Sequence, residues 1–126
     1  MNSRSLRADF GKALDQMRAA LEVPAENDVI KAGCIQYFEF CFELAWKTIK
    51  RVAEEDGLEC TSPKSALKTA FSNGWIDDEE TWLEMLSARN RMAHTYSAAD
   101  ALKIYARLPA YLDAMSRLAD TLAAKR

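Results

Sequence analysis

Glycine and proline are scarce in this sequence, with four and three among 126 residues. Alanine, leucine, lysine and glutamate are abundant instead, and this composition favours helices over strands. There is no run of about 18 apolar residues, the length that a membrane-spanning helix needs. The first residues carry charges with no apolar core behind them, unlike a signal peptide. We therefore expect a helical protein of the cytoplasm with no membrane segment.

Cysteine and histidine are also few, with three cysteines and one histidine. An odd number of cysteines without a Cys-x-x-Cys pair is typical of reduced thiols. A single histidine offers too few ligands for a structural zinc site. We therefore expect no metal and no cofactor. Cys34 and Cys41 fall on one face of a predicted helix and are expected in the core.

Excess positive charge is absent as well, because the net charge is -2 and the sequence pI is about 5.5. A protein that coats duplex nucleic acid without sequence preference is usually basic. Any contact with nucleic acid must therefore be local. The chain length indicates one domain, residues 1–126, which can bury about two thirds of its unfolded surface.

Apolar residues recur at spacings of three and four along five segments, the pattern of amphipathic helices. Capping signals predict these helix bounds: Ser3 or Ser5 to Glu22, Asn27 or Asp28 to Asp56, Ser62 to Asn73, residues 77–80 into the segment 89–96, and Ser97 or Asp100 to near the last residue. Pro109 is expected to bend or divide the last helix near Tyr105. We predict an all-α fold, an antiparallel up-and-down four-helix bundle with an additional short helix.

The second predicted helix, about 28 residues and roughly 40 Å long, is apolar on two sides. Phe42 and Trp46 belong to one apolar stripe, and Phe40 belongs to the other. Such a helix either lies at the centre of a bundle or contacts a partner. Between the stripes, Glu43 and Lys47 are one turn apart and are expected to form an ion pair. They form either a solvated stripe or the charged lining of a cleft beside Trp46.

Residues 87–97 concentrate the groups best suited to chemistry. They include His94, the single histidine, together with Arg89, Asn90, Arg91 and Tyr96. An imidazole moves protons near neutral pH, and a guanidinium binds phosphate with two parallel hydrogen bonds. These are components of a site that binds or cleaves a phosphodiester. The alternative is a plain helix end, where cations and a histidine stabilise the last carbonyl groups.

Helix geometry constrains how these residues could act together. Five residues along a helix correspond to roughly 140° of rotation, so Arg89 and His94 do not share a face of one intact helix. Asn90 and His94 do share a face. Metal-free RNA cleavage also needs both a base and an acid, and a cation on the phosphate. Either the helix loosens near His94, or a two-fold dimer brings two copies of these residues into one groove.

The order of motifs along the chain resembles the nucleotidyltransferase substrate-binding protein family, which belongs to the HEPN superfamily of small helical bundles. The resemblance rests on these motifs: Phe42-Glu43-Leu44-Ala45-Trp46-Lys47, then Ser62-Pro63, then Trp82-Leu83-x-Met85-Leu86, then Arg89-Asn90-x-x-x-His94-Thr95-Tyr96. They cover nearly the whole chain in order. An Arg-x4-His pair alone would be weak evidence, whereas the combination is specific.

The resemblance implies an antiparallel bundle, a homodimer and a partner, a minimal nucleotidyltransferase encoded nearby, often as toxin and antitoxin. It implies that Arg89 holds phosphate and His94 transfers the proton in metal-independent RNA cleavage at the dimer groove. Asn90 would orient the site. Tyr96 would be a residue that the partner modifies with AMP in related pairs. The family name implies instead that the chain binds or presents the partner's substrate.

The resemblance also makes Glu43, Trp46 and Lys47 candidates for binding RNA or nucleotide in a cleft. Three hypotheses remain at this point. The chain is a HEPN-type subunit that cleaves RNA, a non-catalytic subunit that holds substrate for a nucleotidyltransferase, or a plain interaction bundle. In the last case, replacing Arg89 or His94 by alanine would change stability by about 1 kcal/mol or less and nothing else.

Overall fold

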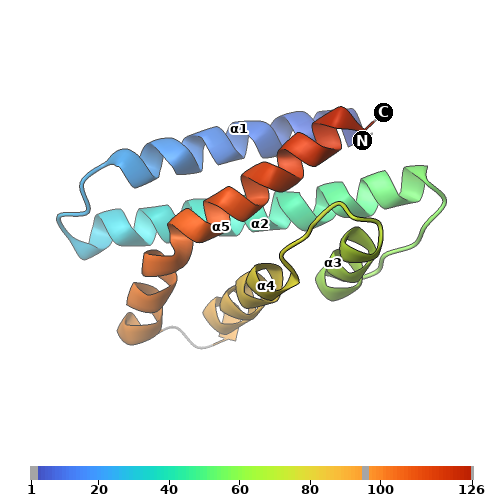
Figure 1. Ribbon diagram of the computed structural model, residues 1–126. Helices are drawn as coiled ribbons and strands as arrows, with labels where there is room; N and C mark the ends of the chain where they lie inside the picture. Colours follow the sequence, from blue (N-terminus) through green and yellow to red (C-terminus); the bar gives the residue numbers. More distant parts are fainter. Residues whose placement is uncertain (1–2, 95–96, 126) are drawn as a thin grey trace.

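Five helices account for most of the computed structural model, which describes residues 3–94 and 97–125. They are α1 (Ser3–Glu22), α2 (Asp28–Glu55), α3 (Pro63–Ser72), α4 (Glu79–His94) and α5 (Ala98–Ala124). No strand occurs in these described residues. Helices α1 and α2 run antiparallel, α5 returns alongside both, and the shorter α3 and α4 lie below α2 (Figure 1). The prediction of an all-α, five-helix bundle is confirmed.

Local capping signals set most of the helix ends. The Asn27 side chain accepts a hydrogen bond from the backbone at the start of α2. Ser62 and Ser65 form a reciprocal capping box at α3, with Pro63 in the first turn. Ser97, rather than Asp100, caps α5. Gly57 follows α2 with a φ of 78°, in the left-handed region that only glycine adopts without strain.

Pro109 lies inside α5, which continues as one helix from Ala98 to Ala124. The helix bends along its length, and its first part turns away from the axis of the remainder (Figure 1). A proline removes one backbone hydrogen bond and clashes with the preceding turn, so it bends a helix. The bend lets the first turns of α5 approach the end of α4, while the rest of α5 lies along α1 and α2.

The core is built from the predicted apolar stripes. Phe38 and Phe42 of α2 are fully buried, and Phe42 lies beside the Trp82 ring of α4, with ring centroids 6.4 Å apart. Cys34 and Cys41 are buried free thiols, as predicted. Burial raises the pKa of the Cys41 thiol to about 12, so it is protonated and inert at neutral pH.

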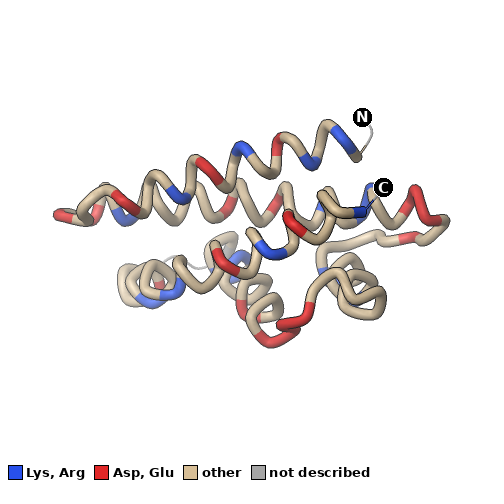
Figure 2. Tube along the Cα trace, turned by 45° about the horizontal axis from the view of Figure 1, so that its top comes forward, with Lys and Arg blue, Asp and Glu red and all other residues tan. Residues whose placement is uncertain are grey.

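Charge of neither sign dominates a large face of the bundle. Lys and Arg are interspersed with Asp and Glu along α1 and α5, and acidic residues gather where α4 begins (Figure 2). Because of this mixture of charges, any site for an anionic polymer is confined to a few side chains.

Within the described residues, no helix is both long and apolar enough to cross a membrane.

Candidate functional site

A single carboxylate, that of Glu43, joins α2 to α4. Arg89 Nε on α4 donates to Glu43 Oε1 at 2.9 Å. Trp46 Nε1, one turn along α2, donates to Glu43 Oε2 at 3.0 Å. The Arg89 and Glu43 side chains are 34% and 33% exposed, so the pair lies at the boundary between core and solvent. One carboxylate oxygen therefore holds Arg89, which remains accessible to a ligand, and the other holds the Trp46 indole.

Asn90 extends this cluster along α4. Arg89 Nη1 donates to Asn90 Oδ1 at 3.2 Å, so the guanidinium is held from two sides. The structure thus brings together Glu43, Trp46, Arg89 and Asn90, which the sequence singled out from segments far apart in the chain. A guanidinium positioned in this way can bind a phosphate with little loss of side-chain entropy.

A second acidic residue affects the charge balance beside this cluster. Glu39 lies one turn before Glu43 on α2, and its pKa is raised, first by burial and then by the negative charge of Glu43. Glu43 itself is paired with a cation. The charge of the Glu43 carboxylate is therefore balanced by Arg89, whereas the neighbouring Glu39 carboxylate binds its proton more tightly than usual.

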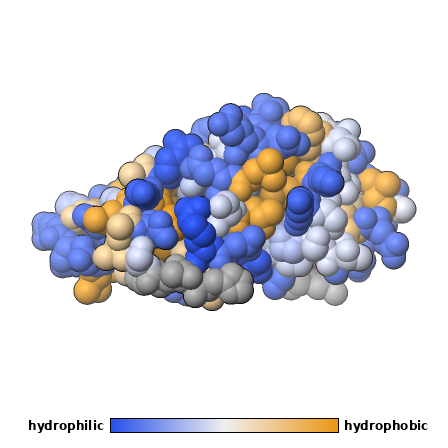
Figure 3. Space-filling view, turned by 90° about the horizontal axis from the view of Figure 1, so that it is seen from below, coloured by the Kyte–Doolittle hydropathy of each residue, from blue (hydrophilic) through white to orange (hydrophobic). Residues whose placement is uncertain are grey.

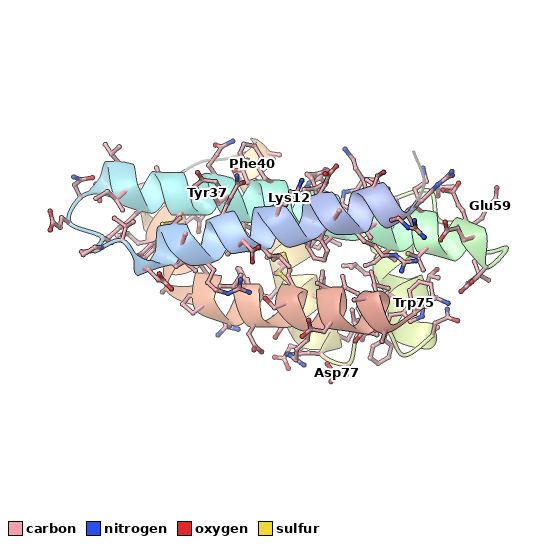
Figure 4. The ribbon with its side chains drawn as sticks, turned by 90° about the horizontal axis from the view of Figure 1, so that it is seen from above. Lys12, Tyr37, Phe40, Glu59, Trp75 and Asp77 are labelled. Atoms are coloured by element: carbon pink, nitrogen blue, oxygen red, sulfur yellow. The ribbon has the colours of Figure 1, made fainter. Side chains whose placement is uncertain are left out.

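Lys47 is a predicted site residue that does not belong to the cluster. It is exposed, and no ion pair joins it to Glu43 in the described part of the chain, because Glu43 bonds to Arg89 instead. Lys47 lines a shallow hollow of about 400 Å³ between α1 and α2, with Lys12 and Phe40 among its other residues. Lys12 and Phe40 lie close together on this face (Figure 4).

His94 is the last residue of α4. The helix is continuous from Arg89 and ends at His94. From Arg89 to His94 the helix turns by roughly 140°, so these two positions lie on different sides of α4. The side chain of His94 is outside the described residues, and so is Tyr96, the predicted modification site.

Sequence reasoning missed a second polar cluster, which fastens α4 to α5. Arg107 donates to both oxygens of Glu84, at 2.6 and 3.1 Å, and the Tyr111 hydroxyl donates to Glu84 Oε2 at 2.5 Å. The hydrogen bonds from Arg107 and then Tyr111 lower the pKa of Glu84. Burial, followed by the bond to Glu84, raises the pKa of Tyr111. No local pattern links Glu84 to Arg107 and Tyr111, because Glu84 is on α4 and the other two residues are on α5.

The pairing of Glu43 with Arg89 can be measured by a double-mutant cycle. Combining Glu43→Gln with Arg89→Met is expected to give a coupling energy of about 0.5–1 kcal/mol in urea unfolding, because the pair is partly exposed. The matched cycle of Glu43→Gln with Lys47→Met should show no coupling. A reversal of these two results would mean that Glu43 pairs along its own helix in solution.

Fold and site together define a small helical-bundle protein with an arginine-centred polar cluster between two helices. The chain belongs to the family described as nucleotidyltransferase substrate binding protein like, whose model matches residues 7–124. A Haemophilus influenzae protein named probable ribonuclease HepT is similar, with 33% identity over 101 residues, 76% of this chain and 69% of that protein.

Two solved structures share the fold. A Thermus thermophilus protein superposes with a TM-score of 0.82 and 31% identity, over 93% of this chain and 99% of that one. A Haemophilus influenzae protein, described as the substrate binding domain of a nucleotidyltransferase, superposes with a TM-score of 0.75 and 29% identity. That match covers 97% of this chain and 99% of the other.

Proposed function

We propose that this chain is the HEPN-type, RNA-cleaving subunit of a two-component module whose other member is a minimal nucleotidyltransferase encoded nearby. The observation that carries the proposal is the arginine of the Arg-x4-His motif. Arg89 is fixed by Glu43 at 2.9 Å and by Asn90 at 3.2 Å, on the helix that ends at His94. The similarity to a probable ribonuclease supports the same activity.

The chemistry is attack of an RNA 2′-hydroxyl on the adjacent phosphorus. His94 removes the 2′-hydroxyl proton, the 2′-oxygen forms a bond to phosphorus, and the bond to the 5′-oxygen breaks. The leaving 5′-oxygen takes a proton, so the products are a 2′,3′-cyclic phosphate and a 5′-hydroxyl. Arg89 stabilises the negative charge that develops on the phosphate oxygens. This reaction requires no cofactor and no redox step.

A homodimer supplies the second proton-transfer group. One histidine in each chain acts as either base or acid in a single step, and a two-fold groove contains two copies of His94 and two of Arg89. The continuous helix between Arg89 and His94 supports this arrangement, because the two positions of one protomer are roughly 140° apart around the helix axis.

Regulation is assigned to the nucleotidyltransferase. Tyr96 follows His94 closely, and transfer of AMP to its hydroxyl places a bulky anion beside the cleavage residues. The added phosphate competes with RNA for Arg89. The module then behaves as a toxin and an antitoxin, with modification of Tyr96 switching cleavage off.

A second function is favoured by one specific observation. The Haemophilus influenzae structure with 29% identity is described as the substrate binding domain of a nucleotidyltransferase. In this alternative the same groove holds nucleotide or RNA without cleaving it and presents it to the partner enzyme. Glu43, Trp46 and Lys47 then contribute to binding together with Arg89 and Asn90.

The products of RNA cleavage distinguish the two functions. Purified protein incubated with single-stranded RNA in EDTA is expected to yield fragments that end in 2′,3′-cyclic phosphate, measured by mass spectrometry. Fragments that end in 3′-hydroxyl would contradict the proposed chemistry. Intact RNA, combined with co-purification of the neighbouring nucleotidyltransferase, would establish the presenting function instead.

A further inference from the structure

A hollow of about 600 Å³ lies on the outer face of α4, where α3 and the first turn of α5 flank it. Its floor is apolar and includes Leu83, which is 44% exposed, and Leu86. Leu83 points away from the core, whereas Leu86 is partly buried and packs against the edge of the core, one turn after the buried Trp82. A band of apolar surface crosses this side of the molecule between hydrophilic residues (Figure 3). Hollows of a few hundred cubic ångströms are typical of small-molecule sites.

Charged side chains surround this apolar floor. Lys64 from α3, Arg91 from α4 and Asp100 from α5 all line the hollow. Among the described residues, no ion pair neutralises any of the three, and Arg91 donates to the neighbouring Ser87 Oγ at 2.8 Å. Two cations and one carboxylate around an apolar floor fit a ligand that has a flat apolar face, one anionic group and hydrogen-bond donors. A nucleotide has all three features.

The hollow adjoins the polar cluster of Glu43, Trp46, Arg89 and Asn90, because Asn90 belongs to both. Asn90 lines the hollow and also accepts the hydrogen bond from Arg89 Nη1 at 3.2 Å. His94 follows Asn90 by one helical turn, so its Cα lies on the same side of α4. A nucleotide in the hollow would therefore lie beside the phosphate that Arg89 binds.

We propose that this hollow binds the nucleotide of an RNA strand next to the cleaved phosphate, an inference that rests on the proposed function. The base packs on Leu83 and Leu86, and its own phosphate lies against Lys64 and Arg91. Asp100 accepts hydrogen bonds from the edge of the base. An ionised carboxylate only accepts, so it favours guanine, whose ring N–H and amino group lie side by side. Uracil places carbonyl oxygens on both sides of its single ring N–H and is disfavoured.

The alternative occupant is a second copy of this chain. Charged residues are depleted from the cores of protein interfaces, whereas Lys64, Arg91 and Asp100 surround this floor closely. Burying three unpaired charges against another protein surface would be unfavourable. A nucleotide matches them and leaves the phosphate side of the hollow open to solvent.

Isothermal titration of the wild-type protein with 5′-GMP and 5′-UMP tests the proposal, because these mononucleotides contain no phosphodiester bond that the protein could cleave. GMP is expected to bind about tenfold more tightly than UMP, the discrimination typical of one bidentate contact. Asp100→Asn should bring the two affinities together, and Leu83→Asp should weaken GMP about tenfold or more. Leu102→Asp is the matched control, because Leu102 is 50% exposed and lies outside the hollow.

The outcomes separate this inference from the proposed function. RNA cleavage by the wild-type protein, combined with equal binding of GMP and UMP that is insensitive to Asp100→Asn, would overturn the base site and leave the ribonuclease intact. Selective GMP binding without any RNA cleavage would support the base site and exclude the proposed ribonuclease activity. If Leu83→Asp dissociates the dimer in sedimentation and leaves GMP affinity unchanged, the hollow is an interface between copies, and the proposal is wrong.

Discussion

Replacing His94 with alanine is expected to lower the rate of RNA cleavage in EDTA by about 10²–10⁴-fold, the usual contribution of one general acid or base. Alanine removes the imidazole that, in the proposed mechanism, accepts the 2′-hydroxyl proton. It is also a good helix former at the end of α4, so the fold should be retained. The rate is measured with a fluorophore-labelled RNA, and circular dichroism checks the helix content. Equal cleavage by both proteins would exclude His94 from the mechanism.

Mixing wild-type protein with His94→Ala tests whether the site is shared between chains. If one groove needs the His94 of both protomers, a mixed dimer lacks one proton-transfer group and is inactive. After random exchange of equal amounts, about a quarter of the rate of the same total amount of wild-type protein should then remain, since only a quarter of the dimers are fully wild-type. If each chain holds a complete site of its own, about half of that rate should remain instead.

Replacing Trp82 with alanine is expected to reduce the free energy of unfolding by about 3–5 kcal/mol, as for other large aromatic residues removed from a core. Trp82 is 1% exposed and packs against the Phe42 ring. With Met85 and Ala88, it makes up the buried face of α4. The loss would be a large part of the total stability of a typical domain, about 5–15 kcal/mol. Because α4 carries Arg89, the same change should also weaken RNA binding.

The neighbouring residue provides a matched control for the stability measurement. Leu83 follows Trp82 on α4 but faces outward and is 44% exposed. Leu83→Ala should change the free energy of unfolding by about 0.5 kcal/mol or less. Urea unfolding followed at 222 nm measures both variants. Equal destabilisation by the two substitutions would contradict the orientation of α4 on the core.

The helix ends that the sequence predicts depend on groups that lie close together along the chain. Ser62 and Pro63 predict the start of α3 because a serine oxygen and a proline ring satisfy the requirements of the first turn by themselves. The stripe that contains Phe38 and Phe42 predicts the buried face of α2, because helical periodicity places these residues together. The bend of α5 (Figure 1) is explained by the backbone donor that Pro109 lacks.

Pairs that join different helices could not be predicted in this way. The sequence indicated Lys47 as the partner of Glu43, one turn away, and the structure pairs Glu43 with Arg89 on another helix. Glu84 of α4 likewise accepts hydrogen bonds from Arg107 and Tyr111 of α5. An ion pair along one helix contributes only a few tenths of a kcal/mol. Core packing sets the rotation of each helix about its axis, and that rotation decides which charged side chains meet.

By itself, the sequence determined the five helices, their apolar faces and the Arg-Asn-x-x-x-His motif at the end of the fourth. Only the tertiary structure decided that Arg89 is held by Glu43 and that an apolar hollow opens beside Asn90. The physical reason is the range of the forces. Capping and periodicity act over one or two turns, whereas the hollow exists only because three helices converge there.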